Sequence, residues 1–409
     1  MDQSSDPSNR PVNSVWRPSR VALSAFFLIL PGFFAYHFLL AKSLIPPWLG
    51  GYSSAMALIW LLPLSVLFLK QVVLRPTRRC TMDAAFMAFL GYYLVVLLLN
   101  MGISLRGAAA ADQIGVLPQF FTLYVLARLV PPGAHGLHRT LLFGLLAMSV
   151  AIVTNADEGT FFAASFELLT TADYFANYQA YGFVYTVCLL YVLCATPRLA
   201  HRAWIYAFAL PTLFLNGART ELIGVVALTA TVEFLLSQRK WLMFATAASL
   251  VTIAIAALPI LADFYPESRT IFLFLDYSDD LSKIERTRML DEGWNSIQQN
   301  PWLGALGSHR PGEHIHNALS AWVDLGLIGF AAYSMLIACP AIDLLLLRRL
   351  HLRDASYRLA FSFIFLVALF AITAKHFTHQ LLPLALGAYA RVVVSTRPSW
   401  RTAPIPSAA

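Results

Sequence analysis

Residues 83–103 read DAAFMAFLGYYLVVLLLNMGI, and Asp83 is the one charged side chain in this stretch. A helix that crosses a bilayer needs roughly 20 consecutive, mostly apolar residues, so the stretch is long enough to cross one. Similar runs recur along the chain, without the short alternating segments of a membrane barrel. We therefore predict an all-α polytopic membrane protein with about 12 transmembrane helices, at residues 21–41, 53–69, 83–103, 113–130, 140–155, 174–196, 203–217, 221–236, 241–262, 317–346, 358–374 and 380–396.

The composition also indicates a membrane protein. Of the 409 residues, 58% are hydrophobic and 12% are charged, whereas soluble domains carry about 25% charged residues. The apolar run that begins at Val21 is followed by further runs, which favours a first spanning helix over a cleaved signal peptide. Four cysteines lie in or beside apolar runs and lack metal-ligand spacing, so we expect neither a disulfide nor a structural metal: Cys80, Cys188, Cys194 and Cys339.

The positions of Lys and Arg explain the net charge of +7 without a nucleic-acid partner. With the N-terminus in the cytoplasm, 20 of the 29 basic residues fall in cytoplasmic segments, as the positive-inside rule predicts. The expected order is a cytoplasmic tail (1–20), helices one to nine (21–263), a large outer loop (264–316), helices ten to twelve (317–396) and a second cytoplasmic tail (397–409).

The large outer loop should contain one helix. Ser282 and Glu285 have the spacing of a capping box, and Asn300-Pro301 ends the apolar periodicity that follows. We expect an amphipathic helix over about 283–299 that lies on the outer membrane face. The glycine-rich turn after it delivers His314 and His316 to the mouth of the tenth helix.

Arginines on the outer side are the first candidates for binding an anion. Arg219 lies in a tight turn between the seventh and eighth helices, Arg286 and Arg288 lie on the loop helix, and Arg310 precedes His316. The guanidinium presents a planar fork of donors that suits phosphate oxygens, so these residues could hold a diphosphate. The alternative is that they pair with nearby carboxylates or lipid phosphates, because surface charges are usually solvated.

His316 is the candidate proton acceptor. A neutral imidazole can take a proton from an attacking hydroxyl near pH 7, although a lone histidine also serves for packing or capping. Lys375, His376 and His379 lie in the last outer turn and could reach the same mouth, or could anchor the chain at the interface. Three acidic residues lie within or near the ends of apolar runs and are functional candidates: Glu233, Asp324 and Asp343. The sequence does not show the paired broken helices that are typical of a transporter.

Several of these residues together resemble the O-antigen ligase and polymerase superfamily. The resemblance covers roughly residues 205–335 at motif level and the whole chain at the level of topology. It implies a GT-C-like bacterial inner-membrane enzyme with about a dozen helices, one large periplasmic loop and both termini in the cytoplasm. The residues that carry it are Arg219 in a short outer turn, Asn300-Pro301-Trp302-Leu303-Gly304, His316-Asn317 and Gly326 to Gly329.

The resemblance assigns roles to residues of this chain. The superfamily's catalytic base corresponds to His316, and the arginines that bind the donor's pyrophosphate correspond to Arg219 and Arg286, with Arg288 close behind. It implies a glycan donor on undecaprenyl pyrophosphate and a lipid A core acceptor. Because pyrophosphate is already a good leaving group, neither a metal nor another cofactor is needed. Supporting roles fall to Asn317, His314, Arg310 and Lys375.

One spacing departs from the superfamily pattern. Its ligases usually have nine residues between His-Asn and the first glycine, but here Gly326 comes after eight, which leaves the phase of the helix after His316 open. Ala230 and Ile297 stand eleven positions after Arg219 and Arg286, where polymerases often have glycine; this favours a ligase. The alternatives are an O-antigen or exopolysaccharide polymerase, a transferase that glycosylates protein, and a transporter or flippase of lipid-linked sugars.

Overall fold

The computed structural model describes residues 18–49, 52–101, 113–156, 161, 178–237, 239–265, 268, 270–271, 281–308 and 315–396, and these ranges contain helices and no strand. Each of the twelve predicted stretches coincides with a helix or with consecutive helices. They are α1 (Arg20–Ile29) with α2 (Pro31–Ala41), α3 (Tyr52–Phe68) with the π-helical η3 (Leu69–Val73), α4 (Thr81–Met101), α6 (Val116–Leu129), α7 (Leu137–Val153), α8 (Tyr178–Ala195), α9 (Leu199–Asn216), α10 (Arg219–Leu236), α11 (Lys240–Phe264), α14 (Leu319–His351), α15 (Ala355–Thr373) and α16 (Leu381–Thr396). The short 3-10 helix η4 (Pro76–Arg78) and α13 (Leu281–Gln299) complete the set.

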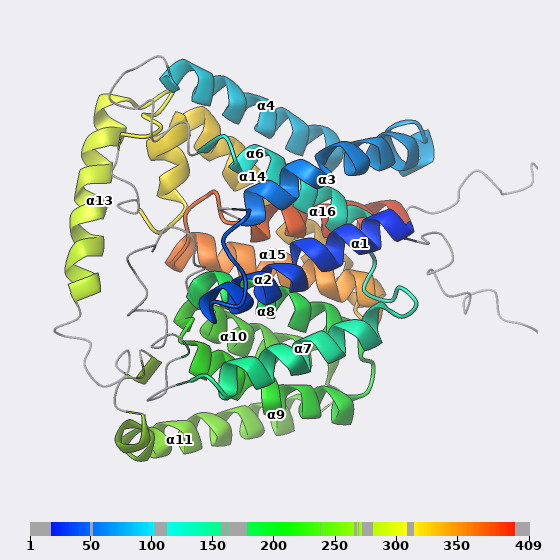
Figure 1. Ribbon diagram of the computed structural model, residues 1–409, viewed down its shortest axis with the longest axis vertical. Coiled ribbons are helices and arrows are strands. Elements are labelled where there is room, and N and C mark those ends of the chain that lie inside the picture. The colour runs from blue at the N-terminus through cyan, green and yellow to red at the C-terminus, as the bar shows by residue number, and fades with distance from the viewer. Residues whose placement is uncertain are drawn as a thin grey trace, which may run out of the picture.

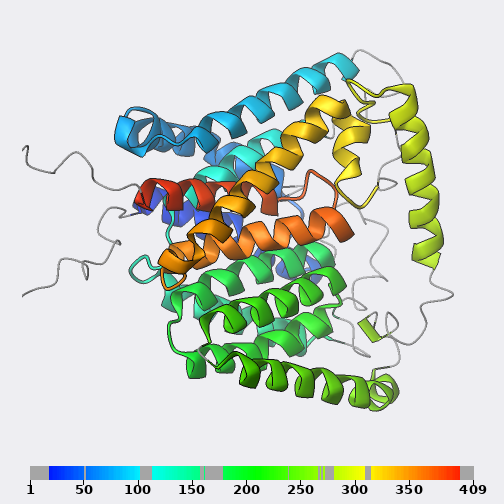
Figure 2. The same cartoon turned by 180° about the vertical axis from the view of Figure 1, so that it is seen from behind.

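The helices fit a polytopic membrane protein. Among the described residues, six segments are long and apolar enough to cross a membrane: Arg20–Ala41, Tyr52–Val73, Thr81–Met101, Tyr178–Ala195, Leu319–Leu347 and Ala355–Thr373. Shorter apolar helices accompany them, and α13 runs across one end of the bundle (Figures 1 and 2). At the centre, α16 packs against α6 and α15. Gly387 permits this approach, because a Cβ there would lie 2.2 Å from the carbonyl oxygen of Tyr124.

Buried arginines stabilise the end of the bundle opposite α13. Arg391 donates to carbonyls at the end of α6, whereas Arg202 and Arg358 donate to carbonyls at the end of α8. The Arg202 guanidinium also pairs with the Glu233 carboxylate at 2.6 Å. These contacts satisfy carbonyls that a helix end leaves without partners, and they place positive charge at the negative end of the helix dipole. Glu233 therefore has a structural partner, away from His316.

The tenth predicted helix is interrupted. α14 begins at Leu319 and has a non-helical residue, Gly326, at φ 71° and ψ −176°. The segment after α13 fills the break: the Leu327 amide donates to the carbonyl of Pro301 at 2.9 Å, and a Cβ on Gly326 would lie 2.1 Å from the Trp302 carbonyl oxygen. The prediction of a continuous helix over 317–346 was therefore wrong at this point. Because the helix changes its phase at Gly326, the break accommodates the spacing of eight residues between His316-Asn317 and this glycine.

α13 confirms the predicted loop helix, with two corrections. It begins at Leu281, so Ser282 lies inside the helix and is not the N-cap that a capping box requires. Its apolar side, predicted to face the membrane, packs partly on protein: Ile297 is buried against Ile315 and Val323. α13 is therefore attached to the chain on both sides of His316.

Candidate functional site

His316 is held between α13 and α14. The preceding Ile315 packs under α13, and a Cβ on Gly293 would lie 2.0 Å from the Ile315 side chain. On the other side, the Asn317 Oδ1 accepts from the Leu319 amide at 2.9 Å, so Asn317 caps α14. His316 itself is half-buried and lines a cavity of about 310 Å³.

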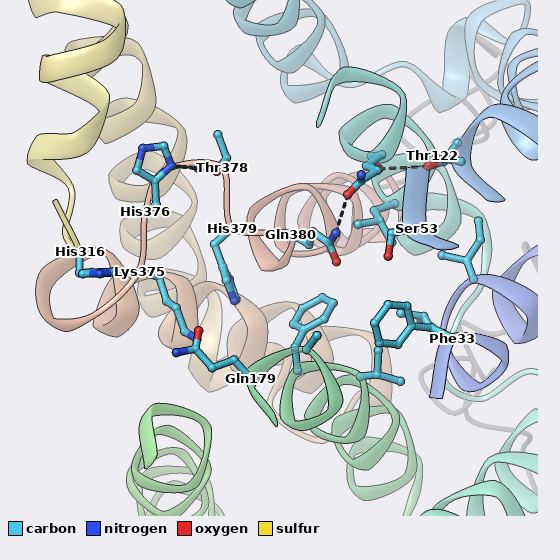
Figure 3. A pocket seen from close by; sticks show the side chains of 18 residues that line it. Phe33, Ser53, Thr122, Gln179, His316, Lys375, His376, Thr378, His379 and Gln380 are labelled. Carbon is cyan, nitrogen blue, oxygen red and sulfur yellow. Dashed lines mark hydrogen bonds between the residues drawn. The ribbon is translucent and has the colours of Figure 1, made fainter. Parts of the chain in front are cut away.

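The segment between α15 and α16 forms the facing wall. Lys375, His376 and His379 line the same cavity as His316 (Figure 3). His376 Nδ1 accepts from the Thr378 hydroxyl at 2.8 Å and from the Thr378 amide at 3.3 Å. Its Nε2 must then carry the proton, which it donates to the fully buried Asp324 carboxylate at 3.0 Å. Asp324 lies just before the break in α14, so this contact joins both halves of the site.

The three histidines of the cavity are uncharged at neutral pH. Burial, followed by the charge of Arg286 and then His376 and Lys375, lowers the pKa of His316 to about 4. Burial lowers the pKa of His376 to about 3, and burial with Lys375 holds the pKa of His379 well below its usual range. A neutral His316 has the protonation state that a proton acceptor requires.

Lys375 lies in the cavity, but its charge is paired. Its ammonium is 2.8 Å from the Glu221 carboxylate and 3.4 Å from the side-chain oxygen of Gln179. Both side chains of the ion pair are buried, at 10% and 2% exposure. Glu221 lies on α10 two residues after Arg219, so the pair joins the α15–α16 connection to the Arg219 turn.

Arg219 begins α10 in the predicted tight turn, and the helices on either side are longer than predicted. Gly217 closes α9 at φ 72°, and the side-chain amide of Asn216 donates to the carbonyl of Tyr178 at 2.9 Å. Gly182 of α8 allows this close packing, since a Cβ there would lie 2.5 Å from the Cβ of Ala218 in the turn. The turn is thus fixed against α8, with Arg219 partly buried and outside the cavity lining.

The two arginines of α13 differ in their electrostatic reach. Arg286 is exposed, and its charge lowers the His316 pKa. Arg288 is half-exposed and lies 3.6 Å from Glu292, one turn along the same helix. Of these two arginines, Arg286 is the one whose charge contributes to the lowered pKa of His316. Arg310 and His314 lie outside the described residues.

Sequence reasoning missed part of the cavity wall. Gln119 of α6, Gln179 of α8 and Gln380 before α16 line it, whereas Asp324, a candidate from the sequence, lies behind it as the partner of His376. The available signal was a polar side chain within or beside an apolar run. That signal does not discriminate well, because Asp343 also fits it, yet its carboxylate accepts from the Tyr389 hydroxyl at 2.7 Å in the contact of α14 with α16.

Comparison with known proteins identifies one matching family. Residues 204–334 match the family model described as O-antigen ligase. The matched region includes Arg219, Arg286, the Asn300–Gly304 segment, His316 and the break at Gly326. None of the curated proteins compared matches the chain.

Proposed function

Since its residues 204–334 place the chain in the O-antigen ligase and polymerase superfamily, we propose that it is an O-antigen ligase. The enzyme transfers a glycan from undecaprenyl pyrophosphate to a sugar of the lipid A core. The observation that carries the proposal is His316, a neutral imidazole of the matched region that lines a cavity.

The reaction is a single displacement. His316 takes the proton of the acceptor hydroxyl, the acceptor oxygen bonds to the anomeric carbon, and the bond from that carbon to the pyrophosphate oxygen breaks. Undecaprenyl pyrophosphate leaves with the electron pair, and the anomeric centre is inverted. General-base assistance of this kind contributes about 10²–10⁴-fold to the rate.

Arg219 and Arg286 bind the departing pyrophosphate in this mechanism. A well-placed donor to developing negative charge contributes roughly 3–4 kcal/mol. The charge of the donor also opposes that of Arg286 and Lys375, so donor binding raises the pKa of His316 and makes it a stronger base. Arg288 and Arg310 have supporting positions along the same loop.

The proposed setting is the bacterial inner membrane. All twelve apolar segments cross it, the His316 end faces the periplasm, and both tails are cytoplasmic. The distribution of Lys and Arg supports this orientation.

The decisive test is transfer by the purified protein. We expect it to join a labelled undecaprenyl-pyrophosphoryl glycan to rough lipopolysaccharide without added metal or nucleotide. The substitution His316→Ala should abolish transfer, whereas His201→Ala, on the exposed face of α9, should preserve it. If the label instead extends another glycan, the protein is a polymerase and the ligase assignment fails.

A transporter of lipid-linked sugars is the second candidate, because α14 is broken and Asp324 is buried beside the break. Broken helices with buried polar groups are typical of transporters. A transporter would move labelled donor across the membrane of reconstituted vesicles without consuming it. A ligase would consume donor on one face only.

A further inference from the structure

The cavity extends well away from His316. Figure 3 shows His316 and Lys375 at one end, Phe33 and Ser53 at the other, and Gln179 and Gln380 between them. The far part lies among α1, α2, α3, α6 and α8. All five helices lie outside the matched residues 204–334, so the family match does not account for this part.

The described residues that line the cavity carry no unpaired charge. Lys375 forms an ion pair with Glu221, and His376 and His379 are neutral because they are buried. Arg219 and Arg286 do not line the cavity. Among the described lining residues a diphosphate therefore meets no unpaired cation, whereas an uncharged polar group needs no counter-charge there.

The polar side chains offer both donors and acceptors. The Gln380 amide donates to the side-chain oxygen of Gln119, and the Gln119 amide donates to the Ser54 hydroxyl at 2.7 Å. Within the described ranges, this leaves the side-chain oxygen of Gln380 and the hydroxyl of Ser53 without a hydrogen-bond partner. Hydroxyl groups act as donor and acceptor together, so they match such a set.

The remaining wall is apolar. Leu30, Phe33, Phe183 and Val184 supply aliphatic and aromatic surface to the same cavity. A sugar ring presents hydroxyls at its edge and C–H groups on its faces, so it suits a wall of this mixed kind. A polyprenyl chain would leave the amides without partners, which costs free energy in a dry environment.

We propose that this cavity binds an uncharged, hydroxyl-rich sugar residue of the acceptor and presents its reacting hydroxyl to His316. The donor diphosphate then approaches from the other side, where α10 carries Arg219 and α13 carries Arg286. The inference rests on the proposed transferase function, and it assigns separate sides of His316 to the two substrates.

Kinetics with the two substrates varied separately test the proposal. Ser53→Ala and Gln380→Leu should each raise the KM for rough lipopolysaccharide by about 2–10-fold, which corresponds to one lost hydrogen bond. The KM for the lipid-linked donor should not change. Gln71→Leu, in η3 and outside the cavity lining, is the matched control. A change in the donor KM alone would overturn the proposal.

Photo-crosslinking tests the same site without turnover. With p-benzoylphenylalanine in place of Phe183, irradiation with rough lipopolysaccharide alone should give an adduct. The same replacement at Phe143, which is 76% exposed on α7, should give none. Capture of the polyprenyl chain of the donor at position 183 would refute an acceptor site.

The two proposals fail in different ways. If the wild-type protein transfers no glycan but the position-183 adduct forms, the ligase function fails and the sugar site stands. If transfer proceeds while neither the acceptor KM nor the crosslink responds, the sugar site alone fails.

Discussion

The protonation of His316 is set by its neighbours. Burial disfavours the imidazolium form, and together with the charge of Arg286 it lowers the His316 pKa to about 4. Since the reaction needs neutral His316, kcat/KM should be maintained down to about that pH and fall below it. Replacing Arg286→Gln removes a positive charge, so protonation should occur at higher pH. We expect the acid limb of the kcat/KM profile to move upward, towards the ordinary histidine value near 6.5.

Arg288 provides the matched control for this shift. It lies on the same helix but pairs with Glu292, so Arg288→Gln should leave the acid limb in place. Equal shifts in both variants would show that the loop acts through its total charge, and no shift in the Arg286 variant would contradict the assigned coupling.

The Glu221–Lys375 pair should be costly to break. Both side chains are buried, and removing one partner leaves a charge without compensation, which costs about 3–5 kcal/mol. Glu221→Gln should therefore lower the thermal unfolding temperature of the detergent-purified protein. The double variant with Lys375→Met should recover much of the lost unfolding temperature, because it removes the buried ammonium that Glu221→Gln leaves without its counter-charge. A double variant no more stable than the single one would argue against the ion pair.

At the scale of elements, the break in α14 requires glycine. The backbone of Gly326 lies in a region that only glycine adopts readily, and strain of this kind costs about 1–3 kcal/mol. A Cβ would also meet the Trp302 carbonyl. Gly326→Ala should thus destabilise the protein and separate the Asn300–Gly304 segment from α14. Gly91→Ala, with nothing within 4 Å of its added Cβ, should be neutral or stabilising by up to about 1 kcal/mol in the same unfolding measurement.

These elements also show what the sequence could and could not predict. The helices follow from run length and apolarity, which need no knowledge of neighbours. The break at Gly326 depends on the Asn300–Gly304 segment docking there, and the packing of α13 depends on Ile315, so both are tertiary effects. The cavity brings together Gln119, Gln179 and Gln380 from separate helices, and no local pattern connects them. His316 was singled out because it stands before Asn317 at the start of an apolar run and corresponds to the catalytic base of the superfamily that the sequence resembles.

At the scale of the molecule, the two ends of the bundle use charge differently. The end opposite α13 buries Arg202, Arg358 and Arg391 against helix-terminal carbonyls, so its positive charge also stabilises the fold. At the His316 end the described arginines lie at a turn and on α13, around a cavity whose described lining carries no unpaired charge. This asymmetry is the reason to expect a fixed orientation, because Lys and Arg are retained on the cytoplasmic side.

The two ends of α15 allow that orientation to be measured. Thr373 lies in its last turn, next to the contact of Ala371 with the chain after His316, and Arg353 precedes its first turn; both are exposed. Single cysteines introduced by Thr373→Cys or Arg353→Cys, in a Cys339→Ser background that removes the exposed native thiol, report on opposite faces. A membrane-impermeant maleimide added to spheroplasts should label position 373 directly, and position 353 only after permeabilisation. The reverse order would place His316 in the cytoplasm, away from a periplasmic acceptor.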